Sequence, residues 1–136
     1  MKIHYLDSSI VIPLMATVIG TRAQRRDPQN LKAAHFVLKT KVKMKISVAT
    51  YAETIRHFPN SDAAKVMLEY FDAPLPLNER HARRWARLQY RSERVMGDND
   101  AWNAALAVAE NGVVVGHDEE AFTDRPDVEY IDYMKA

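Results

Sequence analysis

The sequence predicts a layered α/β fold with a mainly parallel central sheet. Short apolar segments that suit strands, at 2–6, 43–48, 113–116 and 128–134, alternate with stretches whose apolar residues recur at helical spacing. This alternation is typical of βα units, which place helices on the faces of a parallel sheet. A chain of 136 residues is long enough for one core of ordinary size, so we expect a single domain over residues 1–136.

Capping residues mark the expected helix boundaries. Asp27 followed by Pro28 predicts a helix start with Asp27 as N-cap, and Ser8 or Ser9 is expected to cap the first helix. A further helix is expected to begin at Thr50 and to end before residue 59, which is a proline. The remaining expected helices span 61–72, 78 to about 95, and 98 to a stop at 111–112, with caps at Ser61, Asn78 and Asp98.

The composition is that of an ordinary globular chain, with 47% hydrophobic and 27% charged residues. No cysteine is present, which excludes disulfides and thiolate metal sites, so a metal would need oxygen or imidazole ligands. Asp7 interrupts the apolar N-terminal run, and no apolar run approaches the roughly 20 residues of a membrane span. We therefore expect a cytoplasmic protein that does not bind a membrane.

The net charge of +1 hides a strong asymmetry along the chain. Residues 1–50 carry nine Lys and Arg against two acids, whereas residues 96–136 carry two against ten. Either the two parts neutralise each other in the folded chain, or a basic surface lies beside a cluster of carboxylates. The second arrangement is the one that a metal-dependent nuclease needs.

Two aspartates follow expected strands. Asp7 ends the segment KIHYL, and Asp118 comes just after VVVGH. Functional side chains of parallel sheets gather beyond the carboxyl ends of the strands, so both aspartates are expected at that edge. Each also fits a plainer role as a helix cap, although Ser8 and Ser9 could cap the first helix and leave Asp7 free.

Glu53 lies in an expected helix, opposite the apolar stripe of Tyr51, Ile55 and Phe58. A glutamate on a polar helix face is usually only solvated. Its spacing from His57, one turn later, is more often that of a surface contact than of a metal site. Glu53 is therefore a candidate only in combination with the other acids.

Asp100 opens the helix that follows Gly97. Asp98 is the expected N-cap, which leaves Asp100 free for another role or for interaction with the helix dipole alone. The expected core stripe is formed by Trp102, Ala105, Leu106 and Ala109. The face around Asp100 holds small residues that would let a ligand or a backbone approach closely, namely Asn103, Ala104 and Ala107.

Four carboxylates from separated segments could converge on one or two divalent cations. Oxygen-only ligation suits Mg²⁺ or Mn²⁺. Such a site polarises a phosphodiester and lowers the pKa of a bound water. The four candidates are Asp7, Glu53, Asp100 and Asp118.

Three segments resemble, in order, those of the PIN-domain nucleases and of the VapC-like toxins within them. YLDSSI is similar to the opening apolar-Asp-[ST] segment, and ISVATYAET to the segment in which Glu follows Ser by six positions. DAWNAALAVAENGVVVGHDEEAF is similar to the D-x-x-apolar-A-A and T-x-[ND]-x-x-x-F tail. The resemblance covers nearly the whole chain and selects the same four acids as the site.

The resemblance implies a flavodoxin-like three-layer sandwich, Mg²⁺- or Mn²⁺-dependent endoribonuclease activity, a homodimer and a cognate antitoxin. The chain departs from the pattern at two positions. Gly116 stands in place of the usual Thr or Ser, which removes a hydroxyl that commonly supports the metal site. Asn103 stands where an apolar residue is common, and is either a substitute for that hydroxyl or an incidental polar residue. Ser9 and Asn103 are secondary candidates for positioning ligands or substrate.

The helix expected from residue 78 carries an arginine stripe within about a third of its circumference. Trp85, Ala82 and Leu88 point away from the stripe, toward an expected core. Guanidinium groups suit contacts with phosphate, so the stripe favours RNA binding. An acidic antitoxin segment or the chain's own acidic part is the alternative partner. The stripe consists of Arg80, Arg83, Arg84, Arg87, Arg91 and Arg94.

These observations predict a metal-dependent endoribonuclease. A module on the same scaffold that binds RNA or protein without cleaving it is the alternative, and Gly116 is the residue that gives it weight. A nuclease that acts on DNA with similar acids is a third hypothesis.

Overall fold

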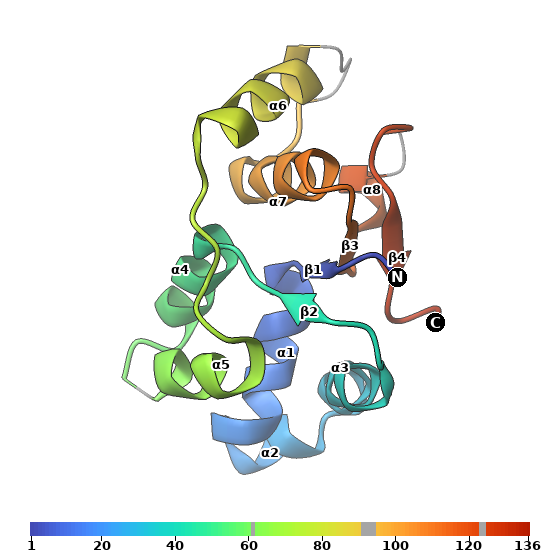
Figure 1. Ribbon diagram of the computed structural model, residues 1–136. Coiled ribbons are helices and arrows are strands. Elements are labelled where there is room, and N and C mark those ends of the chain that lie inside the picture. The colour runs from blue at the N-terminus through green and yellow to red at the C-terminus, as the bar shows by residue number, and fades with distance from the viewer. Residues whose placement is uncertain (61, 91–94, 123–124) are drawn as a thin grey trace.

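The computed structural model describes residues 1–60, 62–90, 95–122 and 125–136. Its centre is a sheet of four strands in the order β2-β1-β3-β4, and all neighbouring strands run parallel (Figure 1). The predicted α/β fold with a parallel sheet is therefore confirmed. The strands are β1 (His4–Leu6), β2 (Met44–Lys45), β3 (Val113–Gly116) and β4 (Tyr130–Asp132).

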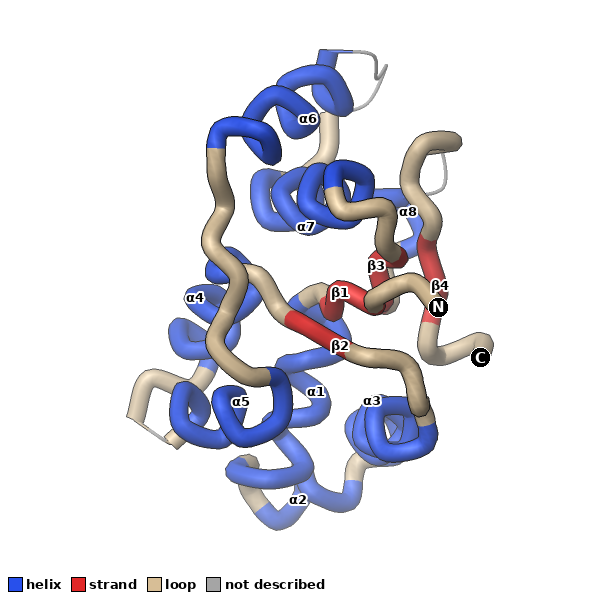
Figure 2. The backbone as a smooth tube through the Cα atoms, viewed as in Figure 1, coloured by secondary structure: helices blue, strands red, loops and turns tan. Residues whose placement is uncertain are grey.

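Helices cover both faces of the sheet and make a three-layer arrangement. Figure 2 shows α6 and α7 on one side of the strands, and α1, α2 and α3 on the other. The helices are α1 (Ser8–Ile19), α2 (Arg22–Arg26), α3 (Pro28–Lys39), α4 (Val48–His57), α5 (Ala63–Phe71), α6 (Glu79–Tyr90), α7 (Asp98–Ala109) and α8 (Glu119–Phe122).

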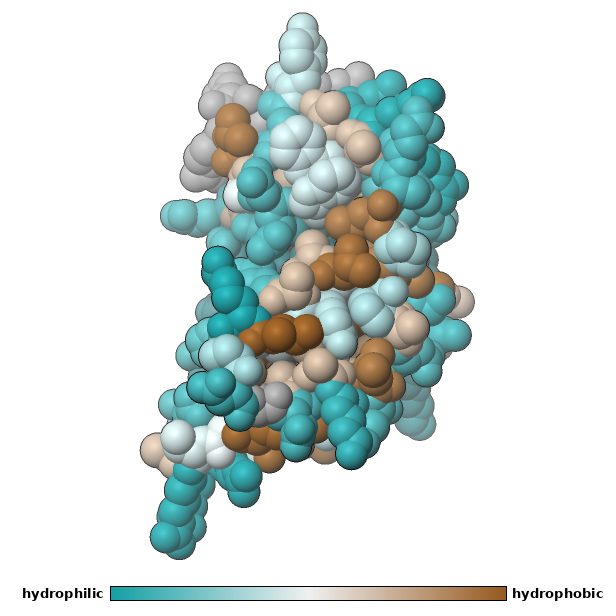
Figure 3. Space-filling model, turned by 90° about the vertical axis from the view of Figure 1, so that its left-hand side faces the viewer, coloured by the Kyte–Doolittle hydropathy of each residue, from teal (hydrophilic) through white to brown (hydrophobic). Residues whose placement is uncertain are grey.

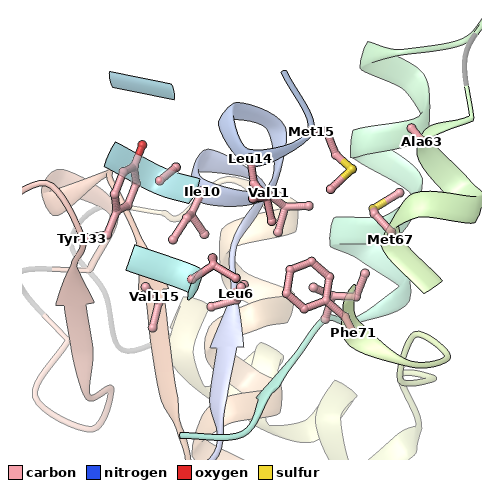
Figure 4. Packing of buried hydrophobic residues seen from close by; sticks show 13 residues of the cluster. Leu6, Ile10, Val11, Leu14, Met15, Ala63, Met67, Phe71, Val115 and Tyr133 are labelled. Carbon is pink, nitrogen blue, oxygen red and sulfur yellow. The ribbon is translucent and has the colours of Figure 1, made fainter. Parts of the chain in front are cut away.

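Two apolar clusters hold the layers together. Successive strand residues point to opposite faces, so Leu6 and Val115 join the cluster under α1, whereas Tyr5 and Val114 join the cluster under α7. Figure 4 shows the first cluster, in which side chains of α1 and α5 meet Leu6 and Val115. The sheet is thus buried on both faces, as a parallel sheet requires.

The structure confirms two of the predicted caps, Asp27 and Asn78, and corrects the cap of the first helix. The Asp27 side chain accepts hydrogen bonds from the first amides of α3, and Asn78 accepts from the amides of residues 80 and 81 at the start of α6. The first helix is capped by Asp7, whose side chain accepts from Ser9 N, so the prediction of Ser8 or Ser9 was wrong.

Two further helices begin earlier than predicted. Ser47 caps α4, which starts at Val48 rather than at Thr50. Asp98 is already the first residue of α7, and Gly97 stands at its N-cap position without a side-chain hydrogen bond, so the prediction of Asp98 as cap was wrong.

The ends of two strands and of α5 differ from those of the predicted segments. β2 and β4 are shorter than the segments predicted as strands. Asp62 occupies the N-cap position of α5, while Ser61, the predicted cap, lies outside the described residues. α6 is described as far as Tyr90, and the predicted continuation over 91–94 also lies outside them.

The segment after α5 runs beside the β2 edge of the sheet. Leu75 N donates to Ile46 O and Leu75 O accepts from Val48 N, both at 2.9 Å. Prolines precede and follow Leu75 in the sequence. This single residue therefore extends the sheet by one parallel bridge.

Apolar surface is exposed on one side of the molecule (Figure 3). Figure 3 looks onto the side where α4 and α5 lie, and shows apolar surface between hydrophilic ends. On these two helices the exposed large apolar side chains are Val48, Leu68 and Tyr70. In the described part of the chain, no helix combines the length and apolar character needed to cross a membrane.

Candidate active site

The carboxyl ends of β1 and β3 lie side by side and carry two of the predicted acids. Leu6 pairs with Val115 in the parallel register, and Asp7 N donates to Val115 O at 2.8 Å. Asp7 follows β1 directly and is buried, whereas Asp118 follows β3 by two residues and is exposed. The predicted location of both aspartates at this edge is confirmed.

Both carboxylate oxygens of Asp7 are held by hydrogen bonds. Oδ2 accepts from Ser9 Oγ at 2.7 Å and from Ser9 N at 3.3 Å, while Oδ1 accepts from Asn103 Nδ2 at 2.9 Å. Burial raises the pKa of Asp7, and the charge of Glu53 adds to this rise, while the hydrogen bonds from Ser9 and Asn103 oppose it. Asp7 is thus a cap for α1 and a member of the candidate site at the same time.

Asp100, in the first turn of α7, lies close to the other three acids. Burial, together with the negative charges of Asp7, Asp118 and Glu53, raises the pKa of Asp100 to about 7. On the same helix, Asn103 donates to Asp7 and Asn99 donates to Glu53, and Asp100 and Asp118 line one hollow. The structure therefore brings the four predicted carboxylates together.

Glu53 approaches the site from α4. It is half-buried, and its Oε2 accepts a hydrogen bond from Asn99 Nδ2 at 2.7 Å, so it does not lie on a freely solvated face. His57, one turn later, is exposed and contacts the ring of Phe58 edge-on at 4.9 Å between centroids. Asn99 links α7 to the carboxylate of α4 at the rim of the site.

Asp118 is both a predicted site residue and a cap for α8, because its Oδ1 accepts a hydrogen bond from Ala121 N at 3.3 Å at the start of that helix. Its backbone N–H donates to the Tyr130 hydroxyl at 2.8 Å, and the Tyr130 ring stacks on Phe122. Asp100 and Asp118 line a hollow of about 210 Å³. Its other lining residues are Val95, Met96, Gly97, Glu120, Ala121 and Arg125.

Gly116 is required by the close approach of Ser9. A Cβ at position 116 would lie 2.7 Å from Ser9 Oγ and 3.1 Å from Asp7 Cβ. Ser9 Oγ uses this space to donate to Asp7 and to accept from His117 N at 2.8 Å. The glycine thus removes a hydroxyl at its own position but leaves room for the hydroxyl of Ser9 beside Asp7.

Helix α7 is buried more completely than predicted. Asn103, Ala104 and Ala107, expected on an open face, are buried along with the predicted core residues Ala105 and Leu106. The reason is that α7 is packed against α4, α6 and two strands of the sheet. Trp102 is half-buried and stacks on Trp85 of α6, with 5.7 Å between the ring centroids.

Several polar residues around the site were not predicted. Asn99 and Asn103 are four apart on one helix face, and this spacing was the available sequence signal for the first of them. Ser47, which contacts Asn103, lies in the segment that resembles the PIN-domain pattern, although it was not predicted as a site residue. No comparable sequence pattern indicates the others, which are Thr50, Tyr130 and the pair His117 and Asp132, whose Nδ1 and Oδ1 lie 2.9 Å apart.

The arginine stripe is partly neutralised by carboxylates. Arg80 forms an ion pair with Glu110, and Arg83 pairs with Glu79 at 2.7 Å. Arg84 and Arg87 are exposed. The other two predicted members, Arg91 and Arg94, lie outside the described residues. Trp85 and Leu88 of α6 belong to the apolar cluster under α7, as predicted.

The donor set of the site fits a hard divalent cation. All four acids offer oxygen, and the burial of mutually repelling carboxylates is the situation that a cation would relieve. Among the described residues, no group of three His, Asp or Glu side chains already stands in an arrangement that could hold a metal ion. Glu53 is bonded to Asn99, and Asp118 caps α8, so both would have to turn toward a cation.

Comparisons with known proteins agree with the sequence pattern. No protein-family profile matches the chain. The sequence is similar to Ribonuclease VapC1 of Haemophilus influenzae, with 26% identity over 140 residues, 98% of this chain and 99% of the relative.

The structure is similar to VapBC-1 from nontypeable Haemophilus influenzae, with a TM-score of 0.71 and 25% identity over 97% of this chain and 98% of that chain. FitAcB from Neisseria gonorrhoeae shows the same fold, with a TM-score of 0.76 and 18% identity over 98% and 99% of the two chains. These similarities confirm the predicted resemblance to VapC-like PIN-domain proteins and the predicted three-layer fold.

Proposed function

We propose that this chain, which is VapC-like in sequence and in fold, is a Mg²⁺- or Mn²⁺-dependent endoribonuclease and the toxin of a toxin–antitoxin pair. The observation that carries the proposal is the convergence of Asp7, Glu53, Asp100 and Asp118 at one edge of the sheet, where side chains of α7 bond Asp7 and Glu53 and where Asp100 and Asp118 line one hollow. The similarity to ribonucleases along the whole chain supports cleavage rather than the alternative of a module that only binds.

The residues of the site divide the work as follows. Asp7 and Asp100 would hold the cation from the end of β1 and from α7, and Glu53 and Asp118 would complete the set from α4 and from the turn after β3. Ser9 and Asn103 hold the two oxygens of Asp7 in place. When bound, a divalent cation supplies Lewis-acid chemistry to the phosphodiester and to the attacking water. The exposed arginines of α6 contact phosphates of the RNA on the way to the site.

A cognate antitoxin and a homodimer are part of the proposal. The similarity to VapBC-1 supports the antitoxin, which would be encoded beside this chain as a short reading frame. Co-expression of the two frames, followed by gel filtration, tests both: we expect one complex that contains two copies of this chain, and separate elution of the two products would contradict the pairing.

RNA cleavage tests the activity directly. The purified chain is incubated with single-stranded RNA and with DNA of the same sequence, in Mn²⁺ or in EDTA. We expect metal-dependent cleavage of RNA, which falls by at least about 100-fold in Asp7→Asn and Asp100→Asn because even the outer partners of a metal site contribute 10- to 100-fold.

Asp62→Asn is the matched control, since Asp62 is exposed and its side chain makes no capping hydrogen bond. It should cleave like the wild type. Undiminished cleavage by Asp100→Asn would contradict the assignment of the site. Cleavage of DNA in preference to RNA would contradict the substrate class.

A further inference from the structure

A buried polar cluster lies between α4 and α7, directly behind Asp7. We name it the polar seam, and it consists of Ser47, Thr50 and Asn103, which are 1%, 0% and 1% exposed. Buried hydroxyl and amide groups are costly unless they are hydrogen-bonded, so such a cluster persists only when its members satisfy one another.

The members of the seam form a connected chain of hydrogen bonds. Ser47 Oγ donates to Asn103 Oδ1 at 2.8 Å, and Thr50 Oγ1 lies 3.1 Å from Asn103 Nδ2. Asn103 Nδ2 in turn donates to Asp7 Oδ1 at 2.9 Å. An ionised carboxylate only accepts hydrogen bonds, so the amide nitrogen must face Asp7, and the amide oxygen is left to accept from the Ser47 hydroxyl.

The seam contacts the three segments that carry Asp7, Glu53 and Asp100. Thr50 Oγ1 also donates to Leu6 O at 3.1 Å, the last carbonyl of β1 before Asp7. Ser47 is at the same time the N-cap of α4, which carries Glu53 one turn beyond Thr50. Asn103 stands one turn beyond Asp100 on α7. A single amide therefore connects the segments that carry three of the four carboxylates.

We infer that the polar seam is a positioning device, which fixes the orientation of Asp7 and its distance from Glu53 and Asp100 before a cation binds. The inference rests on the proposed metal-dependent function. Asn103, where an apolar residue is common in the resembling proteins, is the central member of the seam. Asn99, which donates to Glu53 at 2.7 Å, makes a second link between α7 and α4 at the rim.

A matched pair of substitutions separates positioning from simple stability. Thr50 and Thr54 are both fully buried on α4, and Thr54 Oγ1 donates to Thr50 O, a carbonyl of its own helix. Thr50→Val and Thr54→Val each remove one buried hydroxyl of the same size. Titration calorimetry with Mn²⁺ should show an affinity about 10-fold lower for Thr50→Val, as for the loss of an outer partner of a metal site, and an unchanged affinity for Thr54→Val.

The triple variant Ser47→Ala/Thr50→Val/Asn103→Leu replaces the whole seam by apolar groups. Replacing all partners of a buried network at once is nearly neutral for folding, so its melting temperature without metal should exceed that of Asn103→Leu alone. Its Mn²⁺ affinity should nevertheless stay at least about 10-fold below that of the wild type, because Asp7 Oδ1 has lost its donor.

The outcomes distinguish the inference from the function on which it rests. Wild-type affinity in the triple variant, or equal affinities in Thr50→Val and Thr54→Val, would overturn the seam as a positioning device and leave the proposed function standing. If the wild type itself binds no Mn²⁺ and cleaves no RNA, the proposed function fails, and the inference fails with it.

Discussion

At the scale of single residues, Gly116 and Ser9 share one small volume beside Asp7. The Ser9 hydroxyl lies 2.7 Å from the position that a Cβ of residue 116 would occupy, and it bonds both Asp7 Oδ2 and His117 N. A side chain at residue 116 therefore cannot be added without turning the Ser9 hydroxyl away from both partners. The two positions must act as a pair.

We predict that Gly116→Ala lowers the free energy of unfolding by about 1–3 kcal/mol, the usual effect of overpacking a tight site. In a Ser9→Ala background the same change should have a smaller effect, with a coupling of about 0.5–3 kcal/mol between the two positions. Urea unfolding of the four chains of this cycle measures the coupling. Additive effects would show that the two residues do not compete for space.

Residues with two roles explain where sequence-based reasoning about the site failed. The four acids follow from their places after strands and on helices, and from the resemblance. Asp7 was expected to be free because two serines could cap α1, yet the structure gives it the cap as well. Asp98 was expected to cap α7 so that Asp100 could be free, yet α7 begins without any side-chain cap. Each residue was expected to have a single role, whereas one carboxylate can cap a helix and belong to the candidate site at the same time.

At the scale of elements, α6 and α7 form an antiparallel pair that leads toward the acids. Arg80 and the buried His81, near the start of α6, contact Glu110 just beyond the end of α7. At the other end Gln89 exchanges hydrogen bonds with the backbone of Met96, just before α7. The stripe therefore begins about 15 Å along α7 from Asp100, the rise of the ten residues between Asp100 and Glu110, and approaches Asp100 along α6.

We predict that Arg84 and Arg87 contribute more to RNA binding than Arg80 and Arg83. The first two are exposed and lie nearer to the acids, whereas the other two are paired with carboxylates. In an Asp100→Asn background with EDTA, Arg84→Ala/Arg87→Ala should lower the slope of log affinity against log salt by about 1.4, the value for two contacts with a single strand.

Arg80→Ala/Arg83→Ala is the matched control for that measurement and should change the slope by less than half as much. A larger change in the control would indicate that the RNA lies along the far end of α6. An unchanged slope in both variants would favour a protein partner for the stripe.

Helices and strands were predictable from the sequence where neighbouring residues alone determine them. The alternation of strands and helices follows from periodicity, and caps such as Asp27 follow from short-range hydrogen bonding. The burial of Asn103 could not be predicted in the same way, because it depends on α4 reaching α7 across a long sequence separation. A polar residue on a helix reads as solvated until its distant partners are known.

At the scale of the whole molecule, the cluster of acids makes stability depend on pH. The carboxyl of Asp100 has a pKa of about 7 in the folded chain, against about 3.9 in an unfolded one. Between these values the folded state binds more protons than the unfolded state, so the free energy of unfolding falls as the pH rises. This fall is complete above the pKa of the folded state.

We predict that the metal-free chain is less stable at pH 8 than at pH 5, and that Asp100→Asn flattens this difference. Urea unfolding in EDTA, followed by tryptophan fluorescence, measures it at both values. Mn²⁺ should restore stability at pH 8 in the wild type, by about 2.7 kcal/mol at 100 times its dissociation constant, and should not do so in Asp100→Asn. If the free energy of unfolding fell equally with pH in the wild type and in Asp100→Asn, the destabilising charge would belong to a residue other than Asp100.

The residue that bridges to the edge of β2 limits how copies of this chain can associate. Leu75 directs its own N–H and C=O toward Ile46 and Val48, just beyond the end of β2, and its two neighbours in the sequence are both prolines. Proline has no N–H to offer, so this segment presents no donors next to Leu75 to an incoming strand. A partner that approached this segment would therefore dock through side chains rather than by adding a strand there.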